Sequence, residues 1–219
     1  MTDGKSKLSD SDPLEPSADD YVGWTFTEDR AIFNPVVGFS KEWGAMSKPY
    51  AIVDLEVTGI HAESDEILEF AALLVEPSGA ITSEFSALVK GEQPLKHEII
   101  EIVDITQALV DLEGKPLADA MTAFLEFVGN RPAFIHHAEF YQSFLHKAGE
   151  KTGQVFSNNV YDLLFMAMMI WPDWSPHSSN RLMKRLGLPQ VQGGTIGDAK
   201  STLAILLATR DEAFSQNWD

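Results

Sequence analysis

The chain has 219 residues, of which 44% are hydrophobic, and it contains no cysteine. A chain of this length and composition can bury a substantial core and most simply forms one domain with an extension. The absence of cysteine excludes disulfide frameworks, thiolate zinc sites and cysteine nucleophiles, so a metal must be bound here by oxygen or imidazole ligands.

The formal net charge of −17 opposes the phosphate contacts that dominate nucleic-acid affinity, so tight duplex binding is not expected. A protein that binds only the last few nucleotides through bridging metal ions needs less basic surface. The charge also does not exclude a small molecule or another protein as the partner. No apolar run reaches the roughly 20 residues of a membrane helix, and residues 1–16 lack the pattern of a signal peptide. We therefore expect a cytoplasmic protein that does not associate with a membrane.

Four segments are expected along the chain. Residues 1–20 mix Ser, Asp, Pro and Lys without apolar periodicity, which predicts a flexible acidic tail. Residues 21–46 place aromatic side chains among charges and are expected to pack onto the main domain as an extension. The main domain then covers residues 47–210, and residues 211–219 form a C-terminal tail. The two N-terminal segments could cover an active cleft, recruit a partner or do neither.

The main domain opens with strand-like runs that we interpret as three antiparallel strands, Tyr50–Val57, Ile67–Val75 and Ile81–Val89. A polar-capped segment, His97–Ala108, precedes a helix over Pro116–Val128 and a short strand over Ala133–His136, and helical patterns fill the remainder. Three strands followed by alternating α and β elements is the order of the RNase H-like fold. We therefore predict an α/β domain with a mixed five-stranded sheet, three antiparallel strands first, flanked by helices.

Two acids share one face of the first strand. Because side chains alternate along a strand, Asp54 and Glu56 point to the same side of it as Ile52. Like charges in a partly buried place need compensation, and Mg²⁺ or Mn²⁺ is the usual cation for clustered carboxylate oxygens. An isolated Asp-x-Glu more often lies at a solvated strand end, so this pair alone is a weak signal.

A third acid lies on the last helical segment. Ile196, Ala199, Leu203 and Leu206 recur at three- and four-residue steps and form one apolar face of this helix. Asp198 lies beside the upper end of that face, where its side chain could face the sheet.

Several short motifs follow one another in a specific order and spacing. Asp-Leu-Glu-Val-Thr-Gly begins at Asp54, and the next strand carries Asp-Glu-Ile-Leu-Glu-Phe-Ala-Ala from Asp65. Further along come His-Glu-Ile-Ile from His97, Asp-Ile-Thr-Gln from Asp104, Phe-Ile-His-His-Ala-Glu-Phe from Phe134, Phe-Leu at Phe144 and Gly-Asp-Ala from Gly197. With these motifs the chain resembles the DEDD superfamily of 3′-to-5′ exonucleases, which includes RNase T, oligoribonuclease and the proofreading subunit of bacterial replicative polymerase.

The resemblance implies a catalytic site. Members of this family bind two divalent ions between four acids, and a histidine near the last acid takes a proton from the attacking water. Asp54 and Glu56 match the two acids of the first motif, and Asp198 matches the acid of the last. These three residues are thereby implied as catalytic residues and as ligands of one or two Mg²⁺ or Mn²⁺ ions.

The resemblance also implies contacts to the terminal nucleotide. Val57 and Thr58 would place backbone groups near this nucleotide, and Phe140 would offer an aromatic side chain to it.

Two positions depart from the family pattern. The second motif ordinarily reads His-Asn-Ala-x-Phe-Asp, whereas this chain has Tyr141 at the position of the acid. The histidine base is expected five residues before the last acid, where Gly193 stands, and the tyrosine alternative one residue later meets Gly194. The plainer interpretation of Tyr141 is a packing residue whose hydroxyl finds a partner.

Other residues are candidates to replace the missing groups. His137 and His177 could serve as the base, although an unassigned histidine is more often structural. Glu139 and Asp162 could supply an acid, although Glu139 projects from a different side of its helix than Tyr141 and is expected to face solvent. Three cations could contact phosphate: Arg181, Lys184 and Arg185. The plainer interpretation is that they lie on a solvated face of a helix.

Two functions follow from the sequence. One is a metal-dependent 3′-to-5′ exonuclease of weak or unusual mechanism that acts on single-stranded DNA or RNA 3′ ends. The other is a pseudo-nuclease that keeps the fold to bind a nucleic-acid end, a nucleotide or a protein. The sequence selects neither DNA nor RNA, and it leaves open whether the chain forms a homodimer, as some relatives do.

Overall fold

The structure is a computed structural model that describes residues 40–103 and 105–216. Contacts divide the chain into two units, residues 1–33 and 34–219, and all described residues belong to the second. The predicted acidic tail, residues 1–20, and most of the predicted extension, residues 21–46, lie outside the described residues. None of the described helices is long and apolar enough to span a membrane.

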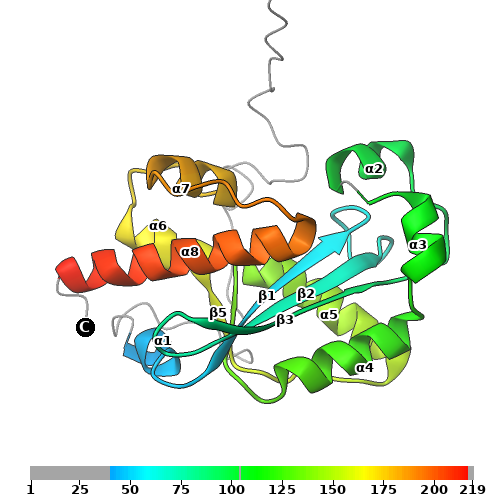
Figure 1. Cartoon of the computed structure of the whole chain (residues 1–219), viewed down its shortest axis with the longest axis horizontal. Coiled ribbons are helices and arrows are strands. Elements are labelled where there is room, and N and C mark those ends of the chain that lie inside the picture. The colour runs from blue at the N-terminus through cyan, green and yellow to red at the C-terminus, as the bar shows by residue number, and fades with distance from the viewer. Residues whose placement is uncertain (1–39, 104, 217–219) are drawn as a thin grey trace, which may run out of the picture. The chain divides into compact units, whose positions relative to one another are not determined.

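One five-stranded sheet forms the centre of the second unit (Figure 1). Its strands are β1 (Tyr50–Val57), β2 (Ile67–Val75), β3 (Ile81–Leu88), β4 (Ala133–Ile135) and β5 (Val160–Asp162). The strand order is β3-β2-β1-β4-β5; β1 pairs antiparallel with β2, β2 pairs antiparallel with β3, and β4 is parallel to both β1 and β5. The predicted mixed sheet, with three antiparallel strands first, is confirmed.

Helices cover both faces of this sheet, which explains why β1 and β2 are apolar on both sides. Helices α4 (Leu117–Val128) and α5 (Ala138–Thr152) lie behind the sheet in Figure 1, and α8 (Gly194–Ser215) crosses its front. Val53 and Leu55 of β1 belong to the core with α4 and α5. The alternate residues of β1 therefore point toward α8, which packs on β1 and β2.

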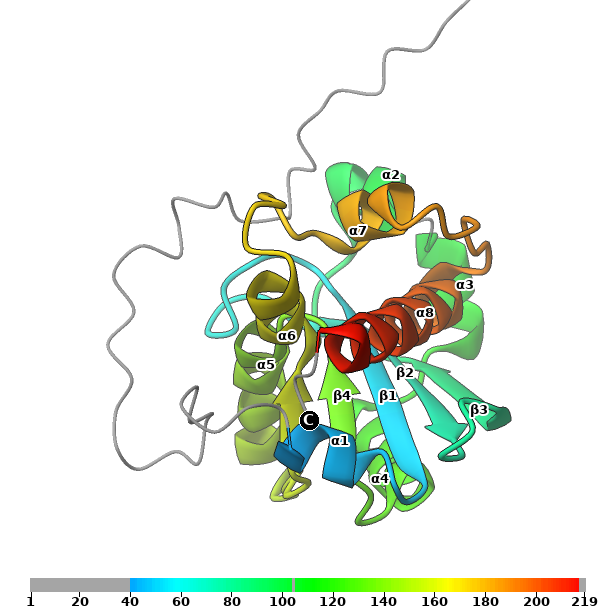
Figure 2. The same ribbon diagram turned by 90° about the vertical axis from the view of Figure 1, so that its left-hand side faces the viewer.

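Five shorter helices complete the described elements: α1 (Ser40–Ala45), α2 (His97–Val103), α3 (Gln107–Glu113), α6 (Leu163–Ile170) and α7 (Ser179–Arg185). The predicted segment from His97 to Ala108 is divided between α2 and α3. Thr106 begins α3, because its hydroxyl accepts the backbone N–H of Leu109 at 3.2 Å. Both views place α2 and α7 beyond the end of the sheet at which β1 ends (Figures 1 and 2).

Helix α8 is longer than the sequence boundary at Arg210 indicates. It continues to Ser215, so the first residues of the predicted C-terminal tail are helical. Near this end the Phe214 ring lies 5.8 Å from the ring of Trp43, a buried residue of α1. The described end of the predicted extension therefore packs against α8.

The core between the sheet and α4 is centred on Phe124, which has no exposed surface. Its ring lies 5.0 Å from that of Phe70 and 5.7 Å from that of Phe156. We expect Phe124→Ala to lower the free energy of unfolding by about 3 to 5 kcal/mol, because the cavity adds to the lost burial. Urea denaturation measures this, with Leu112→Ala, at a position that is 80% exposed, as the control that changes stability by less than about 0.5 kcal/mol.

Candidate functional site

Four acids from three elements gather on the face of the sheet under α8. Asp54 and Glu56 of β1 are partly buried on this face, as predicted. Glu69 of β2 is the direct cross-strand partner of Glu56. Asp198, in the first turns of α8, lies close enough to Asp54 to raise its pKa. The structure therefore brings together the three acids that the sequence singles out and adds Glu69.

Asp54 has the least favourable position for a negative charge. Loss of hydration, followed by repulsion from Asp198 and Glu69, raises the pKa of its carboxyl to about 8. The backbone N–H of Leu55 donates to its Oδ1 at 2.9 Å, and hydrogen bonding with the nearby Tyr141 side chain also opposes the rise in pKa. Asp54 therefore lies among neutral polar groups and further acids.

Tyr141 reaches this carboxyl from the first turns of α5. Its ring packs at the edge of the core and lies 5.1 Å from the ring of Phe140 in an edge-on arrangement. Burial, and then the negative charges of Asp54 and Glu56, hold the pKa of the phenol well above its ordinary value. The phenol therefore stays protonated beside an acid of the first motif.

The backbone at the start of α8 requires glycine where the resemblance implies a base. Gly193 has φ of 124° and Gly194 has φ of 57°, conformations that side-chain-bearing residues rarely adopt. Within the following turn, a Cβ at Gly197 would come within 3.0 Å of the Gln192 carbonyl. A histidine at position 193 would therefore need a different loop, not only a different side chain.

Thr195 connects this loop to the sheet. It is buried, and its hydroxyl donates a short hydrogen bond to the Glu69 carboxylate. This contact directs Glu69 toward the first turn of α8. Sequence reasoning did not assign either residue, although a glutamate in an otherwise apolar strand was the available signal for Glu69.

The two histidines considered as replacement bases have other contacts. His137 has φ of 66°, its ring stacks on Phe140 with centroids 5.3 Å apart, and burial lowers its pKa to about 4. His177 is buried, and its Nε2 lies 2.8 Å from the carbonyl oxygen of Trp171. A role for either histidine as a base stays a prediction.

The structure also shows where the candidates for a replacement acid and for phosphate contacts lie. Glu139 is exposed, as predicted. Asp162 begins α6, where its Oδ1 accepts the N–H of Leu164 at 2.9 Å and its Oδ2 accepts the N–H of Ala138 at 3.0 Å. Lys184 of α7 is exposed and Arg181 is partly buried. The guanidinium of Arg185 lies 5.7 Å from the Trp174 ring centroid.

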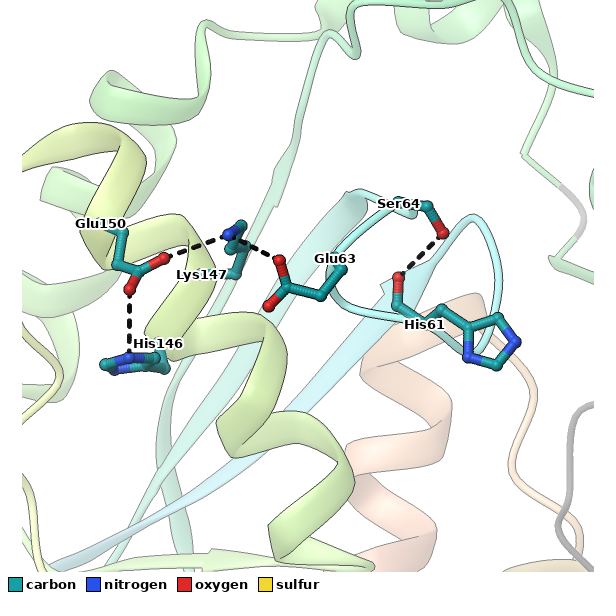
Figure 3. Close-up of polar contacts among 6 residues, drawn as sticks. All are labelled: His61, Glu63, Ser64, His146, Lys147 and Glu150. Atoms are coloured by element: carbon teal, nitrogen blue, oxygen red, sulfur yellow. Dashed lines mark hydrogen bonds and ion pairs between the residues drawn. The ribbon is translucent and has the colours of Figure 1, made fainter.

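The loop from β1 to β2 is closed by its own hydrogen bonds. The Thr58 hydroxyl accepts the backbone N–H of Glu66 at 2.9 Å, and the Asp65 carboxylate accepts that of His61 at 2.8 Å. Lys147 of α5 holds the loop from outside through Glu63, at 2.8 Å (Figure 3). The backbone beside the acids is therefore fixed in place, whereas the Val57 side chain is buried in the core.

These acids do not form a ready metal site. Across residues 40–103 and 105–216, no three His, Asp or Glu side chains are arranged to hold a metal ion. The Asp54 carboxyl already accepts the backbone N–H of Leu55. Tyr141 offers a neutral hydroxyl where a carboxylate ligand is implied, so the residues as placed do not fit a pair of divalent ions.

Comparisons with known proteins agree on one family. A family model described as an exonuclease, RNase T, matches residues 51–206. The PolC-type DNA polymerase III of Clostridium perfringens is 32% identical over 159 residues, and that of Bacillus subtilis is 30% identical over 167 residues. These matches cover 72% and 75% of this chain but 11% and 12% of the polymerases. The chain therefore spans about a tenth of the length of these relatives.

Solved structures show the same fold. Exonuclease X, in complex with 5′ overhanging duplex DNA, superposes with a TM-score of 0.61 and 23% identity and covers 78% of this chain and 94% of its own. The nuclease domain of 3'hExo, a DEDDh family member bound to rAMP, has a TM-score of 0.64 and 16% identity, with the same coverage. The RNase H-like fold expected from the sequence is confirmed.

The φ of 124° at Gly193 leads to a stability prediction. We expect Gly193→Ala to lower the free energy of unfolding by about 1 to 3 kcal/mol, because alanine is strained in this conformation. Gly44→Ala is the matched control, because Gly44 lies in α1 with open space where a Cβ would stand. Alanine there should cause no strain and should raise the free energy of unfolding by up to about 1 kcal/mol. Thermal unfolding of both variants measures the difference, and equal effects would contradict the backbone argument.

Asp162 gives a second stability prediction. Because its carboxylate serves backbone donors of both α5 and α6, we expect Asp162→Ala to cost about 2 to 4 kcal/mol and Asp162→Asn, which keeps one acceptor oxygen, to cost less. Urea denaturation measures both, with Asp173→Ala at an exposed position as the control. A loss no larger than that of the control would show that these N–H groups find other partners.

Proposed function

Because the chain belongs to the RNase T family within the DEDD superfamily of 3′-to-5′ exonucleases, we propose that it binds single-stranded nucleic-acid 3′ ends without hydrolysing them at the rate of a complete active site. The observation that carries the proposal is Tyr141 itself, a neutral residue at the position where the resemblance implies the second-motif acid. It lies near Asp54, one of the acids that the resemblance implies as catalytic.

The absent base supports the same proposal. Glycines at positions 193 and 194 offer no side chain that could take a proton from an attacking water. Loss of a general base by itself slows a reaction by a factor of about 10² to 10⁴. The missing second-motif acid at Tyr141 should slow hydrolysis further.

The surroundings of the site favour binding. The β1–β2 loop, which the resemblance places at the terminal nucleotide, is closed by hydrogen bonds at Thr58 and Asp65 before any ligand arrives. A loop that is already ordered loses little conformational entropy when it binds. Phe140 and His137 form a partly exposed aromatic stack beside Tyr141, and base stacking on aromatic side chains is tolerant of sequence.

The net charge of −17 limits the mode of binding. Few phosphates can be contacted, so we expect recognition of the last nucleotides of a short strand, not of a duplex. DNA and RNA both fit this proposal, because no described contact selects the sugar.

A weak metal-dependent exonuclease is the second candidate. The observation in its favour is that Asp54, Glu56 and Asp198 lie together on one face, as the family mechanism requires. This candidate needs the Tyr141 hydroxyl to leave Asp54 when substrate and metal arrive.

Binding is tested with fluorescently labelled ten-nucleotide DNA and RNA strands, by anisotropy in EDTA. We expect Phe140→Leu to weaken binding about tenfold, because it keeps apolar volume and removes the stacking ring. Phe214→Leu makes the same replacement near the C-terminal end of α8, whereas Asp198 lies near its N-terminal end, and should leave the affinity unchanged. A 3′-phosphorylated strand that binds as well as one with a free 3′ hydroxyl, or a Phe140→Leu affinity equal to that of the wild type, would contradict the proposal.

Hydrolysis is tested separately, with the same strands, Mg²⁺ or Mn²⁺, and a high protein concentration. We expect mononucleotide release slower by at least about 10²-fold than that of an exonuclease with all four acids and its base. Release at the rate of such an enzyme, abolished in Asp54→Ala, would establish the second candidate instead.

A further inference from the structure

We propose that Glu66 is a positioning residue for the bound chain end, because its carboxylate fixes the β1–β2 loop, and with it Thr58, from the side of α5. The inference rests on the proposed function, in which the backbone around Thr58 lies beside the terminal nucleotide. Glu66 itself is not expected to touch the strand.

The backbone of Glu66 is joined to Thr58 by two hydrogen bonds. The Thr58 N–H donates to the Glu66 carbonyl oxygen at 2.9 Å, and the Thr58 hydroxyl accepts the Glu66 N–H at 2.9 Å. Thr58 directly follows Val57, the last residue of β1. Because the two hydrogen bonds are reciprocal, a displacement of Glu66 is transmitted to Thr58 at the end of the strand that carries the first-motif acids.

The side chain of Glu66 reaches in the other direction. Its Oε2 and Oε1 accept the backbone N–H of Glu92, at 3.1 and 3.4 Å. The Lys151 ammonium of α5 lies 3.9 Å from Oε1 of Glu66 and 3.6 Å from the Glu92 carboxylate. One carboxylate therefore connects three segments that are far apart in the sequence: the β1–β2 loop, the segment between β3 and α2, and α5.

Close packing does not replace these contacts. The same three segments line a cavity beside α5, together with apolar residues that include Phe144 and Leu117. Lys147 also contacts the loop, but its partner Glu63 is 85% exposed (Figure 3), and exposed ion pairs contribute little. The Glu66 side chain is only 23% exposed, so its contacts are less weakened by water. Glu66 is therefore the main polar connection between the loop and its surroundings on this side.

Gly91 gives independent access to the same contact. A Cβ at this position would come within 2.7 Å of Oε2 of Glu66. That oxygen is the end of a flexible side chain, and Gly91 is not among the described residues with positive φ. Gly91→Ala should therefore push the carboxylate away from the Glu92 N–H without straining the backbone and without changing Glu66 itself.

The experiment measures the affinity for labelled ten-nucleotide strands by anisotropy in EDTA. We expect Glu66→Ala and Gly91→Ala each to weaken binding at least about fivefold, because the loop spends a smaller fraction of time in the binding position. Glu66→Gln keeps an oxygen that can accept the Glu92 N–H and should retain most of the affinity. Gly44→Ala makes the same replacement as Gly91→Ala in open space and should have no effect.

A double variant separates positioning from general destabilisation. In Glu66→Ala no carboxylate remains to be displaced, so adding Gly91→Ala should cause no further loss of affinity. The midpoints of thermal unfolding should stay within about 4 °C of the wild type. Hydrogen exchange measured by NMR should show faster exchange of the Glu92 and Thr58 amide protons in Glu66→Ala, because both lose the contact that orders them.

Three results would overturn the inference. Wild-type affinity in Glu66→Ala would overturn it alone and leave the proposed function standing, as would a full additional loss when Gly91→Ala is combined with Glu66→Ala. A wild type that binds no strand would overturn the proposed function and this inference together. If Glu66→Ala does not fold, Gly91→Ala compared with Gly44→Ala decides the question, and equal affinities of these two variants would contradict the role of Glu66.

Discussion

The gathering of four acids beneath α8, with Tyr141 of α5 near them, is the constraint on which the rest of the site depends. A cluster of this kind is stable only if its charge is reduced or compensated. Burial raises the pKa of Asp54 to about 8, the backbone N–H of Leu55 donates to its carboxyl, and Glu69 accepts a hydrogen bond from Thr195. The acids can therefore coexist beneath α8 without a cation.

The surroundings of the acids are held in place by contacts between several elements. Asp162 gathers backbone donors from the start of α5 and of α6, and Lys147 fixes the β1–β2 loop against α5. Such ordering costs conformational entropy and is retained where binding uses it. In the proposed function, the ordered region serves recognition and the incomplete set of reacting groups accounts for slow hydrolysis.

Local patterns were sufficient to predict the elements and part of the site. Strand alternation placed Asp54 and Glu56 on one face, and the helical repeat placed Asp198 beside the sheet. Glu69 could not be assigned in this way, because its position depends on the register between β1 and β2. The contact of Tyr141 with Asp54 depends on the approach of α5 to β1, which no local pattern encodes. Strand β5, with three residues, is too short for any periodicity to reveal.

The two glycines at the start of α8 make the loss of the base difficult to reverse. A tyrosine can return to aspartate by exchange of one side chain, but positions 193 and 194 now hold a backbone turn that other residues do not fit. A single change of either glycine to histidine would therefore strain the backbone before it could supply a base. Introducing a base at this place would require replacement of the whole loop, not of one residue.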